Sequence, residues 1–264
     1  FQFNPRYWKL IWDTRKACSF LRYFGNELLK KRTEKMKKGE YIPDDILTHI
    51  VRIKDKNPDL NSEEILDDFL ALFIAGQETI ASTLSFVLLE VGKNPDVYTK
   101  LQREIDDKVG KKRVLDYSDV SQLSYTDMVL KESLRLYPPA ANTFREVQTD
   151  HVVGGFTLPA YTTVGMSTFV SGRLEEFFPD PLKFDPERFG PDSASRINSY
   201  TYFPFTLGPR TCLGKQFAEI EGKIILAKLF QNFNYTLDPK QSFDIDEVML
   251  LKPEGKSKCI FSNR

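Results

Sequence analysis

The stretch Phe205-Thr-Leu-Gly208-Pro-Arg210-Thr-Cys212-Leu-Gly214 decides how the rest of this chain is interpreted. It places one cysteine between two glycines, directly before a segment with helical spacing. A thiolate at Cys212 would face free backbone N–H groups and the positive end of a helix dipole, which makes it an available ligand. The glycines let the backbone approach a flat cofactor closely. Arg210 could hold an anionic group of that cofactor, and Phe205 could shield the sulfur from water.

The composition excludes several classes of protein. With 41% hydrophobic and 13% aromatic residues, the 264-residue chain is too apolar to be disordered. The 37 Lys and Arg residues balance 37 Asp and Glu residues, so we expect no nucleic-acid partner. Cys18, Cys212 and Cys259 form no CxxC pair, which excludes a disulfide scaffold and a thiol-rich zinc site and fits a reducing compartment. His49 and His151 lie too far apart in sequence to suggest metal ligands.

Charge is distributed unevenly along the chain. Residues 1–40 contain 11 Lys or Arg against 4 acids, so this segment carries +7 and the remainder −7. Two interpretations remain open, a solvated helix face or a contact with an anionic surface or partner. The strongly apolar stretch Phe69–Gly76 is far shorter than the roughly 20 residues of a membrane span, so we predict no transmembrane anchor here. The start, FQFNPRYW, reads as a cut inside a longer protein whose missing part would hold an anchor.

Hydrophobic spacing and end signals predict a mainly α fold with a minor β part. From residue 143 short alternating runs with paired glycines predict small hairpins, and residues 174–211 predict a long ordered coil without either periodicity. Helices are expected over Arg15–Lys38 (ended by Gly39), Pro43 to about Ile53, Asn61 to Gly92 with Glu64 as capping-box partner, Asn94-Pro95 to near Gly110, Ser124 to before Pro138, and Lys215 to about Phe230.

The spacing F-x-x-G-x-R-x-C-x-G resembles the haem-ligand loop of the cytochrome P-450 superfamily, and the resemblance covers nearly the whole chain. It implies haem b held by the axial thiolate of Cys212, which pushes electron density onto the iron and favours O–O cleavage. It also implies electrons from NADPH through an NADPH-cytochrome reductase, which would dock near Lys131 and Lys215. The chain is identified as the C-terminal portion of the P-450 fold, with the N-terminal portion missing.

On this resemblance the chain is the C-terminal part of one P-450 domain, divided along the sequence. The expected segments are 1–60, a basic helical segment; 61–92, the distal haem helix; 94–137, the helices leading to the ExxR motif; 143–170, small hairpins; 174–214, the meander and cysteine loop; 215–231, the proximal helix; and 232–264, the terminal hairpin.

A second motif, Ala75-Gly76-Gln77-Glu78-Thr79, lies midway along the predicted long helix. In the resembled family this stretch crosses the distal face of the haem. Small residues at Ala75 and Gly76 would leave room for dioxygen. The Thr79 hydroxyl could bond to the Ala75 carbonyl and loosen the helix locally. Glu78 and Thr79 would then supply protons during dioxygen activation.

A third motif, Glu132-Ser-Leu-Arg135, places an acid and a base three residues apart among leucines, which suggests a buried pair. Arg188 matches the third member of this network in the family. We interpret Glu132, Arg135 and Arg188 as a structural clamp that holds the coil beneath the haem and has no chemistry of its own.

A fourth motif, Thr143-Phe144-Arg145, follows the Pro138-Pro139 helix stop. Arg145 matches the position that holds a haem propionate in relatives, and its planar fork suits a carboxylate. The resemblance implies that further residues line the substrate side of the haem, namely Phe73, Ile74, Ala140, Ala141, Asn142, Thr143, Met249 and Leu250.

Longer runs of sequence resemble the cholesterol 24-hydroxylase branch of the superfamily. The implied activity is haem-dependent insertion of one oxygen atom into a lipid, as hydroxylation of a sterol side chain. A fatty-acid hydroxylase of the same superfamily and a truncated, non-catalytic fragment are the alternatives. The implied partners are a lipid or sterol, the reductase, and the cytoplasmic face of the endoplasmic reticulum membrane, which the missing N-terminal part would reach.

Overall fold

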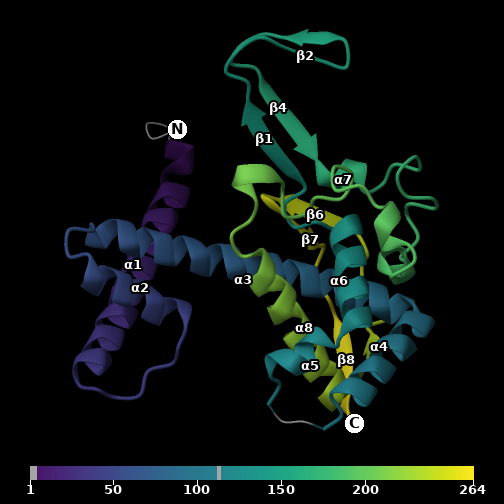
Figure 1. Cartoon of the computed structure of the whole chain (residues 1–264), viewed down its shortest axis with the longest axis horizontal. Helices are drawn as coiled ribbons and strands as arrows, with labels where there is room; N and C mark the ends of the chain where they lie inside the picture. The colour runs from purple at the N-terminus through teal and green to yellow at the C-terminus, as the bar shows by residue number, and fades with distance from the viewer. Residues whose placement is uncertain (1–4, 112–113) are drawn as a thin grey trace. The chain divides into compact units, whose positions relative to one another are not determined.

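The computed structural model describes residues 5–111 and 114–264 (Figure 1). The predicted class is confirmed at this level, because the described residues are mainly helical with small antiparallel sheets. They divide into two compact units, one ending at Gln77 and one beginning at Glu78. The long helix α3, Ser62–Lys93, carries the boundary between the units. The first four residues of the predicted basic segment lie outside the described part of the chain.

The first unit contains α1, Trp8–Lys37, α2, Ile46–Lys56, and the first half of α3. Helix α1 approaches α3 at Gly25, where an added Cβ would lie 2.7 Å from a terminal carbon of Leu66, so a larger residue would require that side chain to move. Arg22 on α1 pairs with Glu63 and Asp67 on α3. These contacts hold the two helices of this unit together.

Two helix starts differ from the prediction. Helix α1 begins at Trp8 rather than Arg15, because a helix that has nucleated extends through neighbouring residues without requiring their burial. It ends near the predicted stop, where Gly39 adopts φ +67°. Helix α2 begins at Ile46 rather than Pro43, because the Asp45 side chain accepts a hydrogen bond from the Thr48 amide and so caps the helix. Hydrogen bonds from Arg32 lower the pKa of Asp45 to about 2.

The second unit is built around the C-terminal half of α3. Asn61 caps this helix at its start through the Glu63 amide, as its sequence predicted. The Asn94 side chain instead donates to the Glu90 carbonyl, and so closes the end of α3 rather than the start of the next helix. The other helices of this unit are α4, Pro95–Lys108, α5, Tyr117–Ser121, α6, Ser124–Leu136, α7, Thr168–Ser171, and α8, Lys215–Asn232.

The main core of the second unit lies where α3, α4, α6 and α8 meet. Its members are large apolar side chains almost completely removed from water, including Val87, Val91, Leu101, Ile105, Leu123, Val129, Leu136, Leu226 and Phe230. Tyr235 joins them from a C-terminal strand, and its hydroxyl donates to the Leu88 carbonyl at 2.8 Å. This packing fixes α6 and α8 against α3, and these are the helices that surround the cysteine loop.

Among the described residues the strands pair into two-stranded antiparallel sheets in which one hairpin lies inside another. Gly154 and Gly155 form the turn of the first inner hairpin, both with positive φ, and Met249 at φ +79° forms the turn of the second. The pairs are β1, Asn142–Glu146, with β4, Thr163–Ser167; β2, His151–Val153, with β3, Phe156–Leu158; β5, Phe233–Leu237, with β8, Cys259–Asn263; and β6, Ile245–Val248, with β7, Leu250–Pro253.

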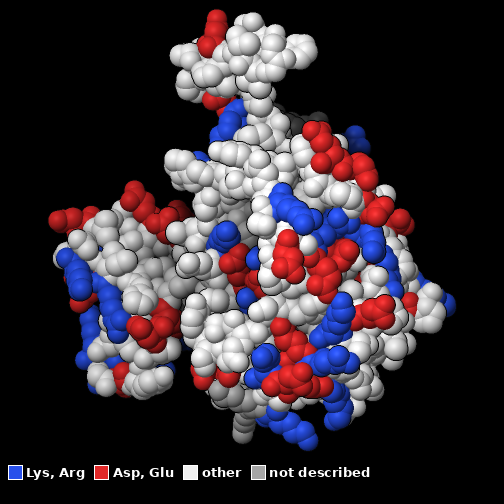
Figure 2. All heavy atoms as spheres, turned by 45° about the vertical axis from the view of Figure 1, so that its right-hand side comes forward, with Lys and Arg blue, Asp and Glu red and all other residues white. Residues whose placement is uncertain are grey.

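Between α7 and α8 the chain follows the predicted coil, interrupted by the short 3₁₀ turns Pro186–Phe189, Ala194–Arg196 and Gly208–Arg210. On the face in Figure 2 the Lys and Arg side chains of the second unit alternate with Asp and Glu side chains. This mixture agrees with a sequence of zero formal net charge.

Within the described residues α3 is the helix whose length and apolar composition would suffice to cross a membrane. In the second unit Phe86, Val87, Leu89 and Val91 of this helix are buried against protein.

The core makes a direct prediction for Phe230. Phe230→Ala should lower the free energy of unfolding by about 3–5 kcal/mol, because it deletes a fully buried ring and leaves a cavity. Phe217→Ala is the matched control on the same helix, since Phe217 is 57% exposed and surface changes stay within about 0.5 kcal/mol. Denaturant titration of both variants measures the difference. Equal losses would contradict the assignment of Phe230 to the core.

Candidate active site

The segment from Phe205 to Cys212 forms a closed loop. The Cys212 amide donates to the Phe205 carbonyl at 2.9 Å, and the Thr211 amide donates to the Gly208 carbonyl at 3.0 Å. Gly208 adopts φ +71°, a conformation that residues with a Cβ rarely reach. These two hydrogen bonds close the loop on itself, and the Cys212 side chain is exposed.

Helix α8 begins directly after this loop, as the sequence predicted. Gly214 occupies the N-cap position, and the Ala218 amide donates to its carbonyl at 2.9 Å. A Cβ added at Gly214 would lie 4.0 Å from the Cys212 sulfur, an ordinary contact distance, so Gly214 is next to the sulfur without being required there by space. Cys212 thus stands at the N-terminal end of an 18-residue helix, where the dipole favours negative charge.

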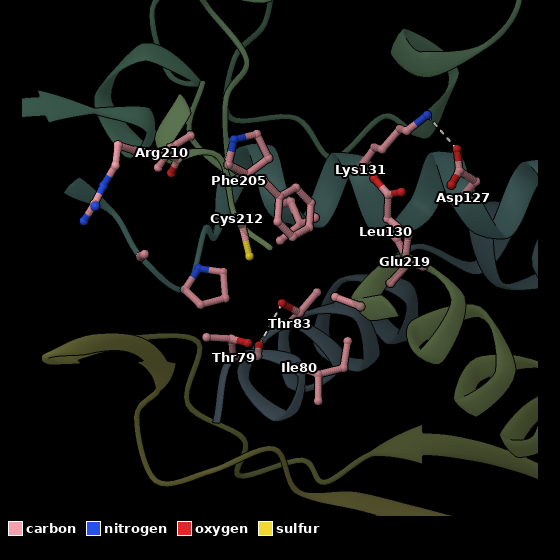
Figure 3. Close-up of a pocket in the computed structure, with 16 residues that line it drawn as sticks. Thr79, Ile80, Thr83, Asp127, Leu130, Lys131, Phe205, Arg210, Cys212 and Glu219 are labelled. Atoms are coloured by element: carbon pink, nitrogen blue, oxygen red, sulfur yellow. Dashed lines mark hydrogen bonds and ion pairs between the residues drawn. The ribbon is translucent and has the colours of Figure 1, made fainter. Parts of the chain in front are cut away.

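A cavity of about 240 Å³ lies beside the loop within the second unit. In Figure 3 the Cys212 sulfur projects into it, between the Phe205 ring and the side chains of Thr79 and Thr83. Its further lining comes from α3, α6, the residues after α6, the loop and α8: Ile80, Asp127, Leu130, Lys131, Leu134, Pro139, Ala140, Pro204, Thr206, Arg210, Ala218 and Glu219. Tertiary structure therefore brings Thr79 and Cys212, far apart in sequence, to one cavity.

Several of these lining residues carry no signal of their own in the sequence that marks them as part of a site. Thr83 lies one helical turn after Thr79, and its hydroxyl donates to the Thr79 carbonyl at 2.9 Å. On α6 the lining positions 127, 130, 131 and 134 also follow one helical face. The i, i+4 spacing could have identified Thr83 once Thr79 was selected. The face of α6 could not be chosen without knowing which helix packs against it.

Charged groups lie at one side of the cavity. Asp127 pairs with Lys131 at 2.6 Å and with Lys223 at 3.0 Å. Burial favours the neutral form of Asp127, but the hydrogen bonds and charges of the two lysines together lower its pKa. Arg210 also lines the cavity, yet Figure 3 shows its guanidinium extending away from the Cys212 sulfur. Its predicted contact with an anionic group of a cofactor stays a prediction.

Arg145 lines a neighbouring cavity of about 220 Å³ rather than the one that holds Cys212. Its Nη1 donates to the Thr143 hydroxyl at 3.0 Å and to the Phe144 carbonyl at 2.8 Å. Thr206 belongs to the walls of both cavities, so Arg145 is next to the cysteine loop. The predicted role of Arg145 toward a propionate stays a prediction.

Glu78 does not line the cysteine cavity, although Thr79 beside it does. Its carboxylate is half exposed and forms an ion pair with Lys252 of β7 at 2.8 Å. Ala75 and Gly76 lie earlier on α3, in the first unit, and are exposed there. The boundary between the units thus divides the sequence motif. To supply protons as predicted, Glu78 would have to give up its ion pair with Lys252.

The residues predicted to line the substrate side differ in their surroundings. Ala141 is buried in a small core cluster with Phe86, Leu89 and Leu251, and its predicted role on the substrate side stays a prediction, while its neighbour Ala140 lines the cavity. Thr143 lines the Arg145 cavity, and Asn142 is exposed on β1. Met249 is 96% exposed at its hairpin turn, and Phe73 and Ile74 are exposed in the first unit, so for these three the role in substrate binding stays a prediction.

The burial predicted for the acid–base pair on α6 is observed. Glu132 and Arg135 have fully buried side chains, and Arg135 Nε and Nη2 donate to the two carboxylate oxygens at 2.7 and 2.8 Å. Arg188 Nε lies 3.4 Å from Glu132 Oε1, as the sequence predicted. The Asp185 amide adds a hydrogen bond to Glu132 at 2.8 Å. Burial raises the pKa of Glu132, and the hydrogen bonds from Arg135 oppose that rise.

Arg135 also binds the coil directly. Its guanidinium donates to the carbonyls of Gly172, Pro181 and Lys183 at 2.5, 2.7 and 3.1 Å. A Cβ at Gly172 would lie 2.5 Å from the Arg135 carbonyl, so this close approach requires glycine. The pair on α6 therefore fixes the start of the long coil that later carries the cysteine loop.

The remaining histidines and cysteines do not line the cavity that holds Cys212. His49 lies 3.5 Å from Asp44 on the surface, and His151 is exposed on β2. Cys18 is exposed, and burial raises the pKa of the Cys259 thiol. In the part of the chain that is described, His, Cys, Asp and Glu residues form no group of three able to hold a metal ion.

Comparison with known proteins agrees with this site. The profile of the cytochrome P450 family matches residues 2–261. Cytochrome P450 4c21 of Blattella germanica is 30% identical over 281 residues, covering 100% of this chain and 55% of the relative. Cytochrome P450 3A9 of Rattus norvegicus and 3A13 of Mus musculus are each 35% identical, covering 88% of this chain and 48% of the relative. The chain therefore belongs to the cytochrome P450 family.

Membership confirms the superfamily that the sequence resembled and implies haem with a cysteine thiolate ligand and electrons from a redox partner. The names of these relatives do not confirm the resemblance to the cholesterol 24-hydroxylase branch. The chain spans about half the length of the relatives it matches. Activity, substrate and partners of the whole protein are therefore matters for proposal.

The clamp predicts unequal losses for its two arginines. Arg135→Met should cost about 3–5 kcal/mol of unfolding free energy, because it leaves Glu132 buried without its main partner. Arg188→Met should cost less, since Glu132 keeps the bonds from Arg135 and Asp185. Thermal and denaturant unfolding of both variants tests the order. An Arg188 variant as unstable as the Arg135 variant would contradict this order. It would show that the 3.4 Å contact between Arg188 and Glu132 stabilises the fold as much as the hydrogen bonds from Arg135 do.

Proposed function

We propose that this chain is the haem-binding and oxygen-activating part of a monooxygenase that inserts one atom of dioxygen into a lipophilic substrate. The observation that carries the proposal is the position of Cys212. Its exposed sulfur, in a self-closed loop at a helix N-terminus, projects into a cavity whose opposite wall contains Thr79. Membership of the cytochrome P450 family supports the same reaction class.

The residues present suit a haem. A single soft sulfur donor near a helix N-terminus fits one axial ligand of iron, and the cavity walls are mostly apolar, as a flat macrocycle requires. Cys212 would supply the thiolate, Gly208 and Gly214 would allow close approach, and Phe205 would cover the sulfur. Arg210 and Arg145 are the candidates for the propionates. The bound haem would supply the redox and dioxygen chemistry.

The chain's own contribution on the opposite side is the handling of protons. Thr79 and Thr83 present hydroxyl-bearing side chains to the cavity on consecutive turns of α3. A threonine hydroxyl held there can position a water and pass a proton to the reacting oxygen. Glu78, paired with Lys252 at the surface, would replace that proton from solvent.

The structure favours a class of substrate, and the proposal of a sterol goes further than that class. Apolar walls such as Ile80, Leu130 and Leu134 favour a lipophilic molecule. We propose hydroxylation of a sterol side chain because longer runs of the sequence resemble the cholesterol 24-hydroxylase branch. Fatty-acid hydroxylation is the alternative. Incubating the complete protein with a sterol and with a fatty acid, and identifying the products by mass spectrometry, distinguishes them. A fragment that binds no haem would support the non-catalytic alternative.

The proposed partners follow from the reaction class. NADPH would supply electrons through a reductase, and Lys131 and Lys215 lie beside the cysteine loop, where they would face an acidic docking surface. Lys131 is already paired with Asp127 at 2.6 Å, so a partner's acid would have to share it. We propose the endoplasmic reticulum membrane, on its cytoplasmic face, as the location, with a part of the protein beyond this chain as the anchor.

The ligand assignment is tested by Cys212→Ser in the complete protein. With the haem reduced and carbon monoxide bound, the variant should lose the long-wavelength difference band that characterises thiolate-ligated haem. The reason is that a serine oxygen does not replace the thiolate. Cys18→Ser and Cys259→Ser are the controls and should keep the band. Retention of the band in the Cys212 variant would make the assignment wrong.

The proton role predicts uncoupling in Thr79→Ala. Haem and substrate should still bind, but product formed per NADPH should fall by at least about tenfold with hydrogen peroxide released, since general-acid contributions are typically 10²–10⁴-fold. Oxygen uptake, peroxide and product are measured together. Thr79→Ser, which keeps the hydroxyl, is the control and should stay coupled. Unchanged coupling in the alanine variant would mean that protons reach the site by another route.

A further inference from the structure

Thr206 is a β-branched residue in a backbone conformation that such residues rarely adopt. Its φ is +59°, in the left-handed region where the Cβ of an L-residue crowds the carbonyl oxygen. Gly208, two residues on, reaches φ +71° without this conflict. Strained backbone of this kind persists where surrounding contacts impose it, and it concentrates at functional sites. The hydroxyl group is what threonine adds here that glycine would not.

The hydroxyl of Thr206 connects the two arms of the cysteine loop, which are residues 203–206 and residues 210–212. Thr206 Oγ1 donates to the Arg210 carbonyl at 2.8 Å, and the Thr206 carbonyl accepts from Thr211 Oγ1 at 3.2 Å. The Thr206 amide donates to the Phe203 carbonyl at 2.9 Å. The backbone and side chain of one residue thus fix both residues that immediately precede Cys212.

The position of Thr206 is as informative as its contacts. It is half-buried and belongs to the walls of three cavities: the one that holds Cys212, the one that holds Arg145, and a third that holds Lys131 and Lys215. Phe205, the residue before Thr206, accepts the hydrogen bond from the Cys212 amide. Loss of the Thr206 hydrogen bonds would therefore loosen the backbone next to this bond and so affect the direction in which the sulfur points.

We infer that Thr206 is a positioning residue for Cys212: its hydroxyl clasps the two arms of the loop and fixes the sulfur in the direction a haem ligand needs. This inference rests on the proposed function, because it assigns Thr206 a role in the same site. Thr206 touches no reacting atom. It acts through the Arg210 carbonyl and the Thr211 side chain, and the clasp offsets the strain of its left-handed backbone.

The test uses the complete haem-loaded protein and the variants Thr206→Ser, Thr206→Gly and Thr206→Val. The readout is the rate at which the long-wavelength band of the reduced, carbonyl-bound protein converts to the short-wavelength form that has lost the thiolate. Thr206→Ser should match the parent because it keeps the hydroxyl. Thr206→Gly should convert about fivefold faster, the factor that one intramolecular hydrogen bond typically carries. Thr206→Val, which keeps the branch without the hydroxyl, should convert at least as fast.

Lys256→Gly is the matched control, since Lys256 also has a positive φ, +68°, but lies in the turn after β7, outside the loop. It should leave the conversion rate unchanged. A Thr206→Gly variant with the parent's conversion rate and an equal or higher melting temperature would overturn the inference, because it would show that the strain was merely tolerated. If the valine variant does not fold, the comparison of serine with glycine decides. A parent without thiolate-ligated haem would instead overturn the proposed function.

Discussion

Arg135 carries a charge that is fully buried in the second unit, and the surrounding structure is organised by the need to satisfy it. Its guanidinium offers five N–H donors, and all five are used by the two Glu132 oxygens and by the carbonyls of Gly172, Pro181 and Lys183. An unpaired buried charge is very costly, so these carbonyls can occupy few other positions. A coil with little regular structure thereby acquires a defined path, and the Phe178 ring beneath the guanidinium, 5.1 Å away, completes the enclosure.

That defined path matters because the coil ends in the cysteine loop. At one end it is tied to α6 by Arg135, and further along Tyr202 donates to the Lys131 carbonyl at 3.1 Å. At its other end α8 packs against α4 and α6 through Leu226 and Phe230. The segment that carries Cys212 is therefore attached to the same core before and after the loop. The Thr206 hydrogen bonds add local rigidity, because these two attachments alone would leave the arms of the loop free to move.

The C-terminal hairpin shows how a second face of α3 is used. Thr79, Ile80 and Thr83 face the cysteine cavity, whereas Glu78 and Ser82 face the hairpin. Ser82 donates to the Leu251 carbonyl, and the Leu251 amide donates to the Pro139 carbonyl at 2.9 Å. The hairpin therefore connects α3 with the residues that follow α6. The acid of the helix motif is engaged in this connection, and the neighbouring threonine is left for the cavity.

The sequence by itself determined several of the local features of this protein. Glycines and an asparagine set helix ends near Gly39 and Asn61, and the i, i+3 spacing with leucine neighbours predicted the buried Glu132–Arg135 pair, because these signals act over one or two turns of chain. The loop around Cys212 was equally readable, since its glycines, cysteine and helix start are adjacent in sequence. Only the tertiary structure decided which groups meet across the chain. It paired Glu78 with Lys252, placed Ala141 in a core cluster, moved Arg145 to a neighbouring cavity and forced Thr206 into a left-handed backbone, because each outcome depends on packing between segments whose contact no local pattern records.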